Sequence, residues 1–275
     1  MSSKISTIMA MAKKTKIGII GLGYVGGALR HWFKKQPGKY EVFFYDKYKN
    51  IGSVDEINRA EIIFVSVPTP FYENGRGYDD SEIENALKGI KNGKIVVLKS
   101  TILPGSTDKF QKRHPRKIIL HNPEFLRAKT AIKDFLKPEK QLIGYTTSKS
   151  RQQAPKILKI LPKAPHSKII KAREAEMVKY FSNTFLATRV IFANQIYDLC
   201  RKLGGIDFEV IRECVGWDPR IGLSHFNIFT DGYRGYSGGC LLKDTKAFIQ
   251  LAKKIRVNLS LLKEVDDSNN KLRKV

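Results

Sequence analysis

KIGIIGLGYVG, residues 16–26, runs from a short apolar segment into three glycines with the spacing GxGxxG. A continuous β-branched run is typical of a strand buried on both faces, and the residues after the turn are suited to a helix. The next apolar run is followed by Asp46, twenty positions after Gly26. This spacing predicts a dinucleotide-binding turn, in which two glycines let the backbone approach a pyrophosphate and the third lets helix and strand pack.

Asp46 indicates which dinucleotide binds. A carboxylate at the end of the second strand accepts a hydrogen bond from a ribose 2′-hydroxyl and repels a 2′-phosphate, so we expect NAD rather than NADP. Lys47 and Lys49, close by in the sequence, weaken this preference. The pyrophosphate is expected at the N-terminus of the first helix, where the helix dipole favours an anion.

Short apolar runs alternate with helix-like segments through the first half of the chain. The runs are KIGII (16–20), EVFFY (41–45), EIIFVSV (61–67), KIVVLKS (94–100), KIILH (117–121) and QLIGY (141–145). Residues 80–90 exemplify the segments between them, with Asp80 and Ser81 as capping candidates. Repeated strand–helix units predict an α/β fold with a Rossmann-like, doubly wound parallel sheet.

The strand pattern ends near residue 150. Residues 172–203 contain no Gly or Pro, carry apolar residues at helical spacing and stop at Gly204–Gly205, which predicts one long helix. We therefore expect three parts: a disordered N-terminal extension (1–14), an NAD-binding Rossmann domain (15–150) and an all-helical central domain (151–275). The long helix is suited to a scaffold or to the spine of a homodimer.

The chain is strongly basic. Its 50 Lys and Arg against 26 Asp and Glu give a net charge of +24, as in proteins that bind polyanions. The basic residues are scattered and form no arm interleaved with aromatic residues. We favour a solvated basic surface, which helps to bind phosphate-bearing ligands, over nucleic-acid binding.

Three cysteines, Cys200, Cys214 and Cys240, are widely spaced and form neither a CxxC pair nor a Cys/His cluster. This pattern argues against a disulfide framework and against a metal site, and it fits the reducing cytoplasm. No apolar run reaches the roughly 18 residues that a membrane-spanning helix needs, so no membrane association is expected. We interpret Cys200 and Cys214 as small buried hydrophobic residues.

Cys240 differs because it follows a glycine pair and precedes a predicted helix, in SGGCLLKD (237–244). A helix N-terminus favours a thiolate, so this cysteine can be a nucleophile. A thiolate that attacks a bound aldehyde gives a thiohemiacetal, which a second oxidation converts to a thioester that water cleaves. Asp244 lies one helical turn later, where it can orient the site or activate that water.

Lys179 and Asn183 are also one turn apart, on the long predicted helix. A cation and an amide on one helix face can stabilise negative charge that develops on a substrate oxygen. A single lysine on a helix is more often solvated. The motifs around these two residues decide between the two interpretations.

Seven motifs occur in order along the chain: GLGYVG (21–26), SVPTP (66–70), KSTILPGST (99–107), NPEFLRA (122–128), EAEMVKYFSNTFLATRVIFANQI (174–196), DPRIG (218–222) and GGCLLKD (238–244). Together they resemble the UDP-glucose/GDP-mannose dehydrogenase family, over nearly all of the chain from residue 15, with spacing most similar to the UDP-glucose branch. The resemblance implies oxidation of a nucleotide sugar, with UDP-glucose as the expected substrate, to a uronic acid with two NAD molecules.

The resemblance also implies roles for individual residues. Lys179 and Asn183 would stabilise the oxyanion, Thr101 would hold a catalytic water, and Glu124 would act as general acid or base. The implied cofactor contacts are Gly21, Gly23, Tyr24, Val25, Gly26, Asp46, Val67, Pro68, Thr69, Ser100 and Thr101. The implied substrate contacts are Glu124, Phe125, Leu126, Arg127, Lys179, Asn183, Asn227, Tyr236 and Gly238, with His225 and Arg234 in the same sugar-nucleotide loop.

Two features depart from the family pattern. Ala128 replaces a carboxylate that usually follows NPEFLR, and the chain stops where the family continues into a C-terminal nucleotide-binding domain. A separate chain could supply that domain. Two alternatives therefore stay open: a two-electron β-hydroxyacid dehydrogenase, and a non-catalytic protein that binds NAD or anions and needs a partner.

Overall fold

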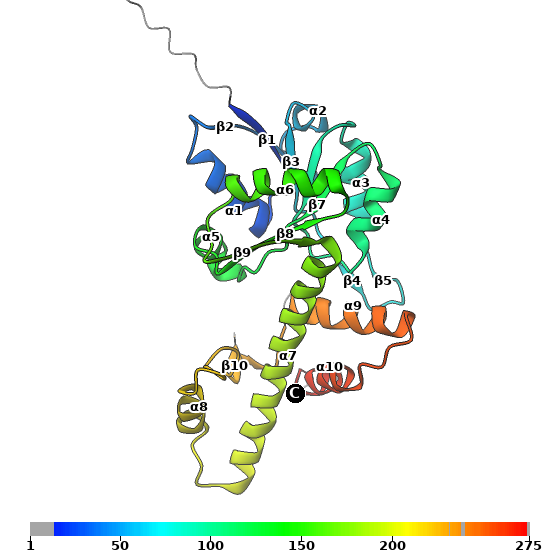
Figure 1. Ribbon diagram of the computed structural model, residues 1–275. Helices are drawn as coiled ribbons and strands as arrows, with labels where there is room; N and C mark the ends of the chain where they lie inside the picture. Colours follow the sequence, from blue (N-terminus) through cyan, green and yellow to red (C-terminus); the bar gives the residue numbers. More distant parts are fainter. Residues whose placement is uncertain (1–13, 231, 238–239, 274–275) are drawn as a thin grey trace, which may run out of the picture. The chain divides into compact units, whose positions relative to one another are not determined.

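The computed structural model describes residues 14–230, 232–237 and 240–273 (Figure 1). The chain divides into two compact units. Unit 1 comprises residues up to Pro68, Ser81–Ser100 and Thr107–Ala175, and unit 2 comprises Thr69–Asp80, Thr101–Ser106 and the residues from Glu176 onward. Apart from Lys14, the predicted N-terminal extension lies outside the described residues.

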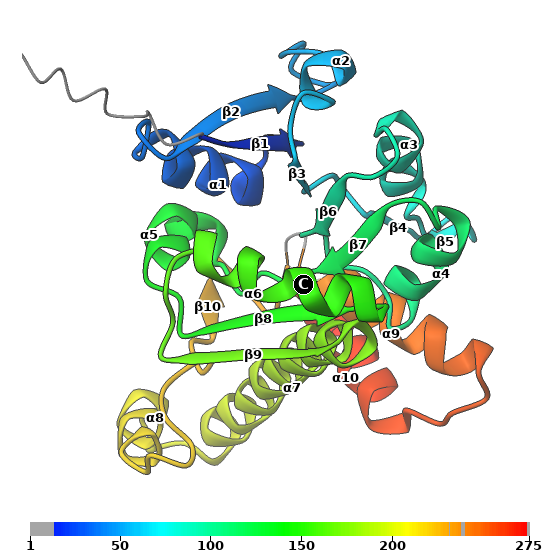
Figure 2. The ribbon, with the colours of Figure 1, turned by 45° about the horizontal axis from the view of Figure 1, so that its top comes forward.

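Unit 1 is built on a seven-stranded sheet with the order β2-β1-β3-β6-β7-β8-β9 (Figure 2). Its strands are β1 (Thr15–Ile20), β2 (Tyr40–Tyr45), β3 (Ile62–Val65), β6 (Ile95–Leu98), β7 (Ile118–His121), β8 (Lys140–Tyr145) and β9 (His166–Lys171). The six predicted strands are all present. The four central strands are β1, β3, β6 and β7. Strands β3, β6 and β7 are buried along their whole length and β1 in its last four residues, because helices cover both faces of the sheet.

Two features of the sheet differ from the prediction. Strand β8 runs antiparallel to β7, through the pairs Leu120↔Tyr145 and His121↔Gly144, so the sheet is mixed rather than wholly parallel. Strand β9 was not predicted. Its sequence HSKIIK has only two adjacent apolar residues, and four of its six residues are exposed, so it has the composition of a solvated edge strand.

Helices of unit 1 flank this sheet. They are α1 (Tyr24–Lys34), α2 (Val54–Ile57), α3 (Ser81–Gly89), α4 (Ser106–Arg113), the 3-10 turn η1 (Ala128–Thr130), α5 (Ala131–Leu136) and α6 (Ser148–Ile160). One core cluster joins the sheet to α1, α5 and α6 through Leu29, Phe33, Phe135 and Ile157. The indole of Trp32 also donates to the carbonyl oxygen of Ile160 at 2.8 Å, which fixes α1 beside the end of α6.

Unit 2 is organised around α7 (Ala172–Leu203), which has the bounds expected from the sequence. The helix stops where Gly204 and Gly205 adopt φ values of +72° and +67°. The other helices are α8 (Phe208–Gly216), α9 (Leu241–Lys254) and α10 (Ser260–Leu272). Apolar residues of α9 and α10 pack on Ala187, Val190 and Ile191 of α7, while Phe208 of α8 packs near Ala193 and Cys200.

The second unit differs from the prediction in two respects. It also contains two short hairpins, β4 (Phe71–Tyr72) with β5 (Gly77–Tyr78) and β10 (Phe229–Thr230) with β11 (Tyr233–Arg234), so it is mainly rather than wholly helical. The division between the units falls after Ala175 rather than at residue 150. The physical reason is that β9 pairs with β8 and α6 packs on the sheet.

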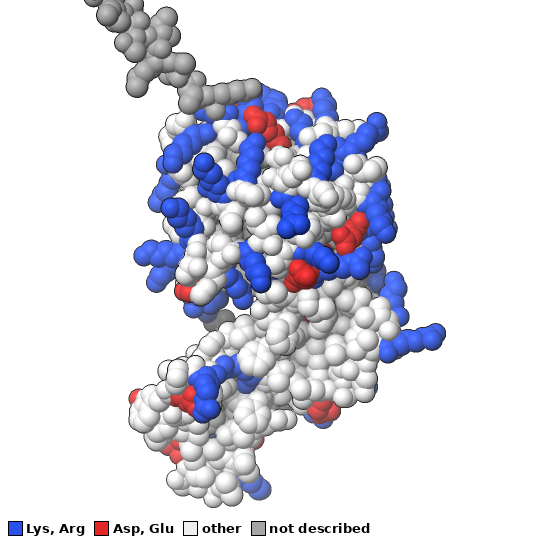
Figure 3. Space-filling view, in the orientation of Figure 1, with Lys and Arg blue, Asp and Glu red and all other residues white. Residues whose placement is uncertain are grey.

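Lys and Arg are dispersed over the face of unit 1 in Figure 3, with few acidic residues among them. Many of them are balanced locally, as in the ion pairs Arg173–Asp108 and Arg113–Glu84. Among the residues that the structure describes, every helix is too short or too polar to cross a lipid bilayer.

Candidate active site

The glycine turn joins β1 to α1 under tight steric limits. Gly21 has a φ of +83°, and a Cβ atom built there would lie 2.5 Å from the carbonyl oxygen of Ser66. A Cβ at Gly26 would overlap the carbonyl oxygen of Gly21. The Ser66 hydroxyl donates to that same carbonyl at 2.8 Å. Glycine is therefore required at both positions by the packing of the turn against its neighbours.

Gly23 and Gly27 serve a different purpose, because a Cβ at either position would meet no atom within 4 Å. Gly23 is the N-cap residue of α1, without a side-chain capping bond, and the first turn of the helix holds no acidic residue. The helix N–H groups are thus left for a ligand, and the open side of the turn fits the pyrophosphate of a dinucleotide.

Asp46 ties the end of β2 to this turn. Its Oδ2 accepts from the backbone N–H of Leu22 at 2.7 Å, and its Oδ1 accepts from those of Tyr48 and Lys49 at 3.0 Å each. The Lys49 ammonium donates to the carbonyl oxygen of Leu22 at 2.6 Å. The carboxylate is 7% exposed, so its position is fixed before any ligand binds.

A cavity of about 390 Å³ opens beside Asp46. Gly21, Gly23, Val67 and Pro68, all predicted cofactor residues, line it. The hydroxyl of Ser100, another such residue, donates to the carbonyl oxygen of Val67 at 2.7 Å. These residues of unit 1 fit the adenosine half of NAD, with the Asp46 carboxylate available to a ribose hydroxyl.

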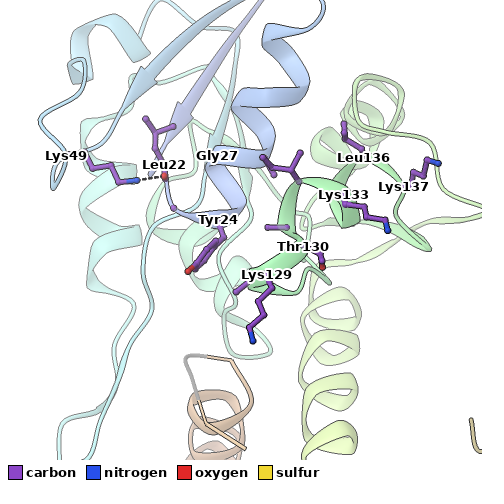
Figure 4. Close-up of a pocket in the computed structure, with 14 residues that line it drawn as sticks. Leu22, Tyr24, Gly27, Lys49, Lys129, Thr130, Lys133, Leu136 and Lys137 are labelled. Carbon is purple, nitrogen blue, oxygen red and sulfur yellow. Dashed lines mark hydrogen bonds between the residues drawn. The ribbon is translucent and has the colours of Figure 1, made fainter. Parts of the chain in front are cut away.

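A larger cavity of about 1020 Å³ is lined by the start of α1 and by the η1–α5 segment (Figure 4). Tyr24, Gly27 and Ala128 belong to its lining. Tyr24 was predicted as a cofactor contact, and its side chain is 70% exposed. Sequence reasoning had not singled out the lysines of η1 and α5 that line this cavity.

The catalytic candidates of unit 2 converge at the start of α9. Cys240 is exposed, and its carbonyl oxygen accepts from the backbone N–H of Asp244 at 3.0 Å, in the first turn of the helix. Asp244 is 1% exposed. Its Oδ2 accepts from the side-chain amide of Asn183 at 2.6 Å, and its Oδ1 pairs with the Lys243 ammonium at 2.5 Å. The structure thus brings Asn183 of α7 to the turn that carries Cys240.

Lys179 lies one turn before Asn183 on α7 and is only 4% exposed. Asn183 is buried as well. The alternative of a solvated surface lysine is therefore wrong, because α7 turns this face into unit 2. A lysine and an amide held on one buried helix face are suited to stabilising negative charge on a bound oxygen atom.

Thr101 and Thr69 are hydrogen-bonded to each other in unit 2. The Thr69 hydroxyl donates to the carbonyl oxygen of Thr101 at 2.8 Å, and the Tyr78 hydroxyl donates to the same atom at 3.3 Å. Burial, with a further contribution from the charge of Asp80, raises the pKa of Tyr78 far above its usual value. The phenol therefore stays a hydrogen-bond donor to the backbone at Thr101.

Glu176 and Tyr180 share this face of α7 and had not been predicted. The carboxylate of Glu176 is fully buried and accepts from the backbone N–H of Gly105 at 2.5 Å. The Tyr180 ring is fully buried and stacks on Phe248, and burial together with Asp244 raises its pKa well above the usual value. The helical spacing 176, 179, 180, 183 could have identified them.

The remaining predicted substrate residues lie in two places. In unit 1, the carboxylate of Glu124 accepts from the backbone N–H of Leu126 at 2.7 Å, and Phe125 lies under the Lys140 ammonium at 4.2 Å. Arg127 is exposed and paired with Asp134 at 2.8 Å, which holds the pKa of that carboxyl well below its usual range.

In unit 2, Asn227 is exposed and accepts from Arg212 at 3.1 Å, whereas Tyr236 is 4% exposed within the core formed with α10. His225 has a φ of +66°, and Arg234 is paired with Asp198 at 2.7 Å. Gly238 lies outside the described residues. Val25 is the second residue of α1, next to Tyr24.

The cysteines depart from the prediction in one respect. Cys200 is buried, as expected, but Cys214 is exposed, so it is not a core residue. The reason is that α8 turns only Phe208 fully into the unit, and most of its other side chains remain partly or fully exposed.

Comparison with known proteins assigns the chain to a family. Residues 45–161 match the "UDP-glucose/GDP-mannose dehydrogenase family, NAD binding domain", and residues 173–271 match the central domain of the same family. A UDP-glucose 6-dehydrogenase of Bacillus subtilis is 35% identical over 79% of this chain and 48% of its own length. One of Rickettsia felis is 32% identical over 81% of this chain and 50% of its own length. The chain therefore spans about half the length of the curated relatives it matches.

The fold agrees with these matches. A UDP-glucose dehydrogenase from the archaeon Pyrobaculum islandicum superposes with a TM-score of 0.80 and 28% identity, covering 94% of this chain and 68% of that structure. A UDP-D-ManNAc dehydrogenase from Pyrococcus horikoshii, at 22% identity, shares the fold with a TM-score of 0.81. With an NAD-binding Rossmann unit followed by a mainly helical unit around α7, the chain belongs to the UDP-glucose/GDP-mannose dehydrogenase family.

Proposed function

We propose that this protein oxidises a nucleotide sugar by four electrons with NAD, and that the sugar is UDP-glucose, converted to UDP-glucuronate. The observation that carries the proposal is the arrangement of Cys240, Asp244 and Asn183: an exposed thiol at a helix start, one turn from a buried carboxylate that α7 holds in place. The names of the relatives support the choice of substrate.

NAD, when bound, would accept the hydride of each oxidation. Gly23 and the first N–H groups of α1 would hold its pyrophosphate, and Asp46 would accept from its adenosine ribose. Val67, Pro68 and Ser100 would line the same part of the cofactor site. Thr69 and Thr101 remain predicted contacts in unit 2.

Cys240 supplies the covalent chemistry. The first oxidation removes a hydride and a proton from the C6 alcohol of the sugar and leaves an aldehyde. The Cys240 thiolate then adds to the aldehyde carbon and forms a C–S bond, giving a thiohemiacetal. Loss of a second hydride and a proton leaves a thioester. Water breaks the C–S bond, releasing the uronate and the thiol; the sum is one alcohol, one water and two NAD⁺ to one carboxylate, two NADH and three protons.

The surrounding side chains have distinct roles in this scheme. Lys179 and Asn183, both buried on α7, stabilise the negative charge on the C6 oxygen during addition and hydrolysis. Asp244 orients Asn183 and helps to activate the hydrolytic water. Thr101 holds that water, and Glu124 acts as the general acid or base that accepts a proton from the water and returns it. Glu124, Phe125, Leu126, Arg127, Asn227, Tyr236 and Gly238 complete the proposed substrate contacts.

A second copy of the chain is the proposed partner. Large apolar side chains on α7 are exposed at helical spacing: Met177, Phe181, Phe185, Phe192, Leu199 and Leu203. Such a stripe in a 32-residue helix is suited to packing against an identical helix. The exposed thiol of Cys240 further favours a reducing compartment such as the cytoplasm, where it stays available for catalysis.

Two matched cysteine variants test the proposal. Purified protein is given NAD and UDP-glucose, and UDP-glucuronate is measured by mass spectrometry. Cys240→Ser is expected to form no appreciable uronate, while Cys214→Ser, which changes the other exposed thiol, keeps the wild-type rate. Equal uronate formation by both variants would contradict a covalent role for Cys240.

A further inference from the structure

The large cavity beside the glycine turn is strongly cationic. Lys49, Lys129, Lys133 and Lys137 line it, and among the described residues in its lining there is no Asp or Glu. In Figure 4, Lys49 reaches the carbonyl oxygen of Leu22, and the other three lysines come from η1, α5 and the residue after α5. A lining with four lysines and no carboxylate among its described residues favours an anionic ligand.

Asp134 of α5 is paired with Arg127, which is not in the cavity lining. Asp134 follows Lys133 in the sequence but is absent from the cavity lining. Its Oδ1 accepts from Arg127 at 2.8 Å, and its Oδ2 accepts from the hydroxyl of Thr130 at 2.8 Å. Position 128, which is also in the lining, is Ala, so η1 adds no carboxylate of its own. The η1–α5 segment therefore contributes lysines but no carboxylate to the cavity lining.

The cavity also receives the start of α1. Gly23, Tyr24 and Gly27 are in its lining, and Gly23 leaves the helix N-terminus without a side-chain cap. Uncapped N–H groups and lysine ammonium groups attract the same ligand chemistry, an oxyanion with several acceptor atoms. A phosphate or pyrophosphate meets this description better than a carboxylate because it offers more acceptors.

The two cavities of unit 1 meet at the glycine turn. Leu22, Gly23 and Lys49 belong to the lining of both the Asp46 cavity and the lysine cavity. A ligand that places a nucleoside beside Asp46 thus brings its 5′-phosphates toward the lysines. No small anion alone would span both sites, whereas a dinucleotide has the necessary length.

We propose that Lys129 and Lys133 are cofactor-binding residues that neutralise the pyrophosphate of the dinucleotide in the lysine cavity. This inference rests on the proposed function, since it takes NAD as the ligand. It adds charged side chains from η1 and α5 to a turn that otherwise offers backbone N–H groups and Lys49. Removal of their charge should weaken NAD binding without altering the Asp46 side of the site.

Calorimetric titration of the full chain tests this proposal. Lys129→Gln keeps most of the side-chain length and is expected to raise the Kd for NAD about fivefold, the size of a charge contact at an exposed site. The Lys129→Gln/Lys133→Gln double variant should raise it about twentyfold. Lys112→Gln, on α4 and outside both cavities, is the matched control and should leave the Kd unchanged.

Two further readouts separate charge from structural damage. ADP-ribose, which keeps the pyrophosphate, should lose affinity in parallel with NAD, while adenosine, measured by ligand-observed NMR, should bind the variants as it binds wild type. The dependence of log Kd for NAD on log salt should also become shallower in the double variant. Unchanged NAD affinity in the double variant, or an equal loss for adenosine, would overturn the inference alone. A wild-type chain that does not bind NAD would overturn the proposed function as well.

Discussion

The side-chain amide of Asn183 donates to the buried Oδ2 of Asp244 at 2.6 Å, which joins the middle of α7 to the first turn of α9. Both partners are more than nine-tenths buried. The bond fixes the position of the turn that begins at Cys240 and leaves the other carboxylate oxygen to Lys243. The stability of unit 2 and the chemistry proposed for it therefore involve the same contact.

Asn183→Ala should destabilise the protein by about 1–3 kcal/mol, because a buried carboxylate oxygen loses its donor. Urea unfolding followed by circular dichroism measures this loss. Asn227→Ala, at an exposed asparagine, should change the free energy of unfolding by less than about 0.5 kcal/mol. Equal effects of the two substitutions would show that the Asn183–Asp244 contact contributes nothing special to stability.

Glycines of the turn should separate into two classes. Gly26→Ala places a methyl group on the carbonyl oxygen of Gly21 and should both destabilise unit 1 and abolish NAD binding. Gly23→Ala meets no protein atom, so thermal stability should stay near wild type while the Kd for NAD rises about tenfold or more, because the methyl group blocks the approach of the pyrophosphate. Thermal denaturation and calorimetry distinguish these outcomes, and wild-type NAD affinity in Gly23→Ala would argue against a cofactor at the turn.

Tyr180 and Tyr78 should make stability pH-dependent at high pH. Burial raises the pKa of both phenols in the folded state above the usual value of 10, so above pH 10 the unfolded chain loses protons that the native chain keeps. The free energy of unfolding is therefore fully retained below pH 10 and falls above it, by about 1.4 kcal/mol per pH unit for each such tyrosine.

Tyr180→Phe should remove one of these contributions from the slope and keep the stacking on Phe248. Its effect at pH 7 should be small, since the Tyr180 hydroxyl makes no hydrogen bond within the described residues. Urea titrations between pH 8 and 11 give the slope. A variant with the wild-type slope would place the Tyr180 hydroxyl in contact with solvent.

Phe181→Asp should separate the proposed dimer. Phe181 is 68% exposed and lies beside Phe185 in the apolar stripe of α7, so a carboxylate there would be buried without a partner in a helix–helix interface. Light scattering should give a dimer for wild type and a monomer for the variant. Leu261→Asp changes an equally exposed residue on α10 and should leave the mass unchanged; a monomeric wild type would refute the dimer.

The sequence predicted the elements whose patterns are local. Six apolar strands stood out, the central ones because helices cover both faces of the sheet, and α7 ended where two glycines take a left-handed conformation. The glycine turn was identifiable because Gly21 and Gly26 are sterically required. By contrast, β9 escaped because only Ile169 and Ile170 are apolar, and β8 gave no local sign of its antiparallel direction.

The site was predictable to a similar extent. Spacing of one helical turn paired Lys179 with Asn183 and Cys240 with Asp244, but the bond between α7 and α9 is a tertiary contact that no local pattern contains. Glu176 and Tyr180 share the helical spacing of Lys179 and Asn183, but a helix of 32 residues has several apolar faces, and packing shows that this one is turned inward. The lysine cavity likewise depends on η1 lying beside the start of α1.

The stoichiometry of NADH to UDP-glucose tests the central claim most directly. The full chain is incubated with excess NAD and limiting UDP-glucose until absorbance at the NADH band stops rising. A four-electron oxidation through Cys240 predicts two NADH per sugar, because the thioester step adds a second hydride transfer. One NADH per sugar would identify a two-electron dehydrogenase, and none with NAD bound would show that the chain does not catalyse this reaction; either result would contradict the account.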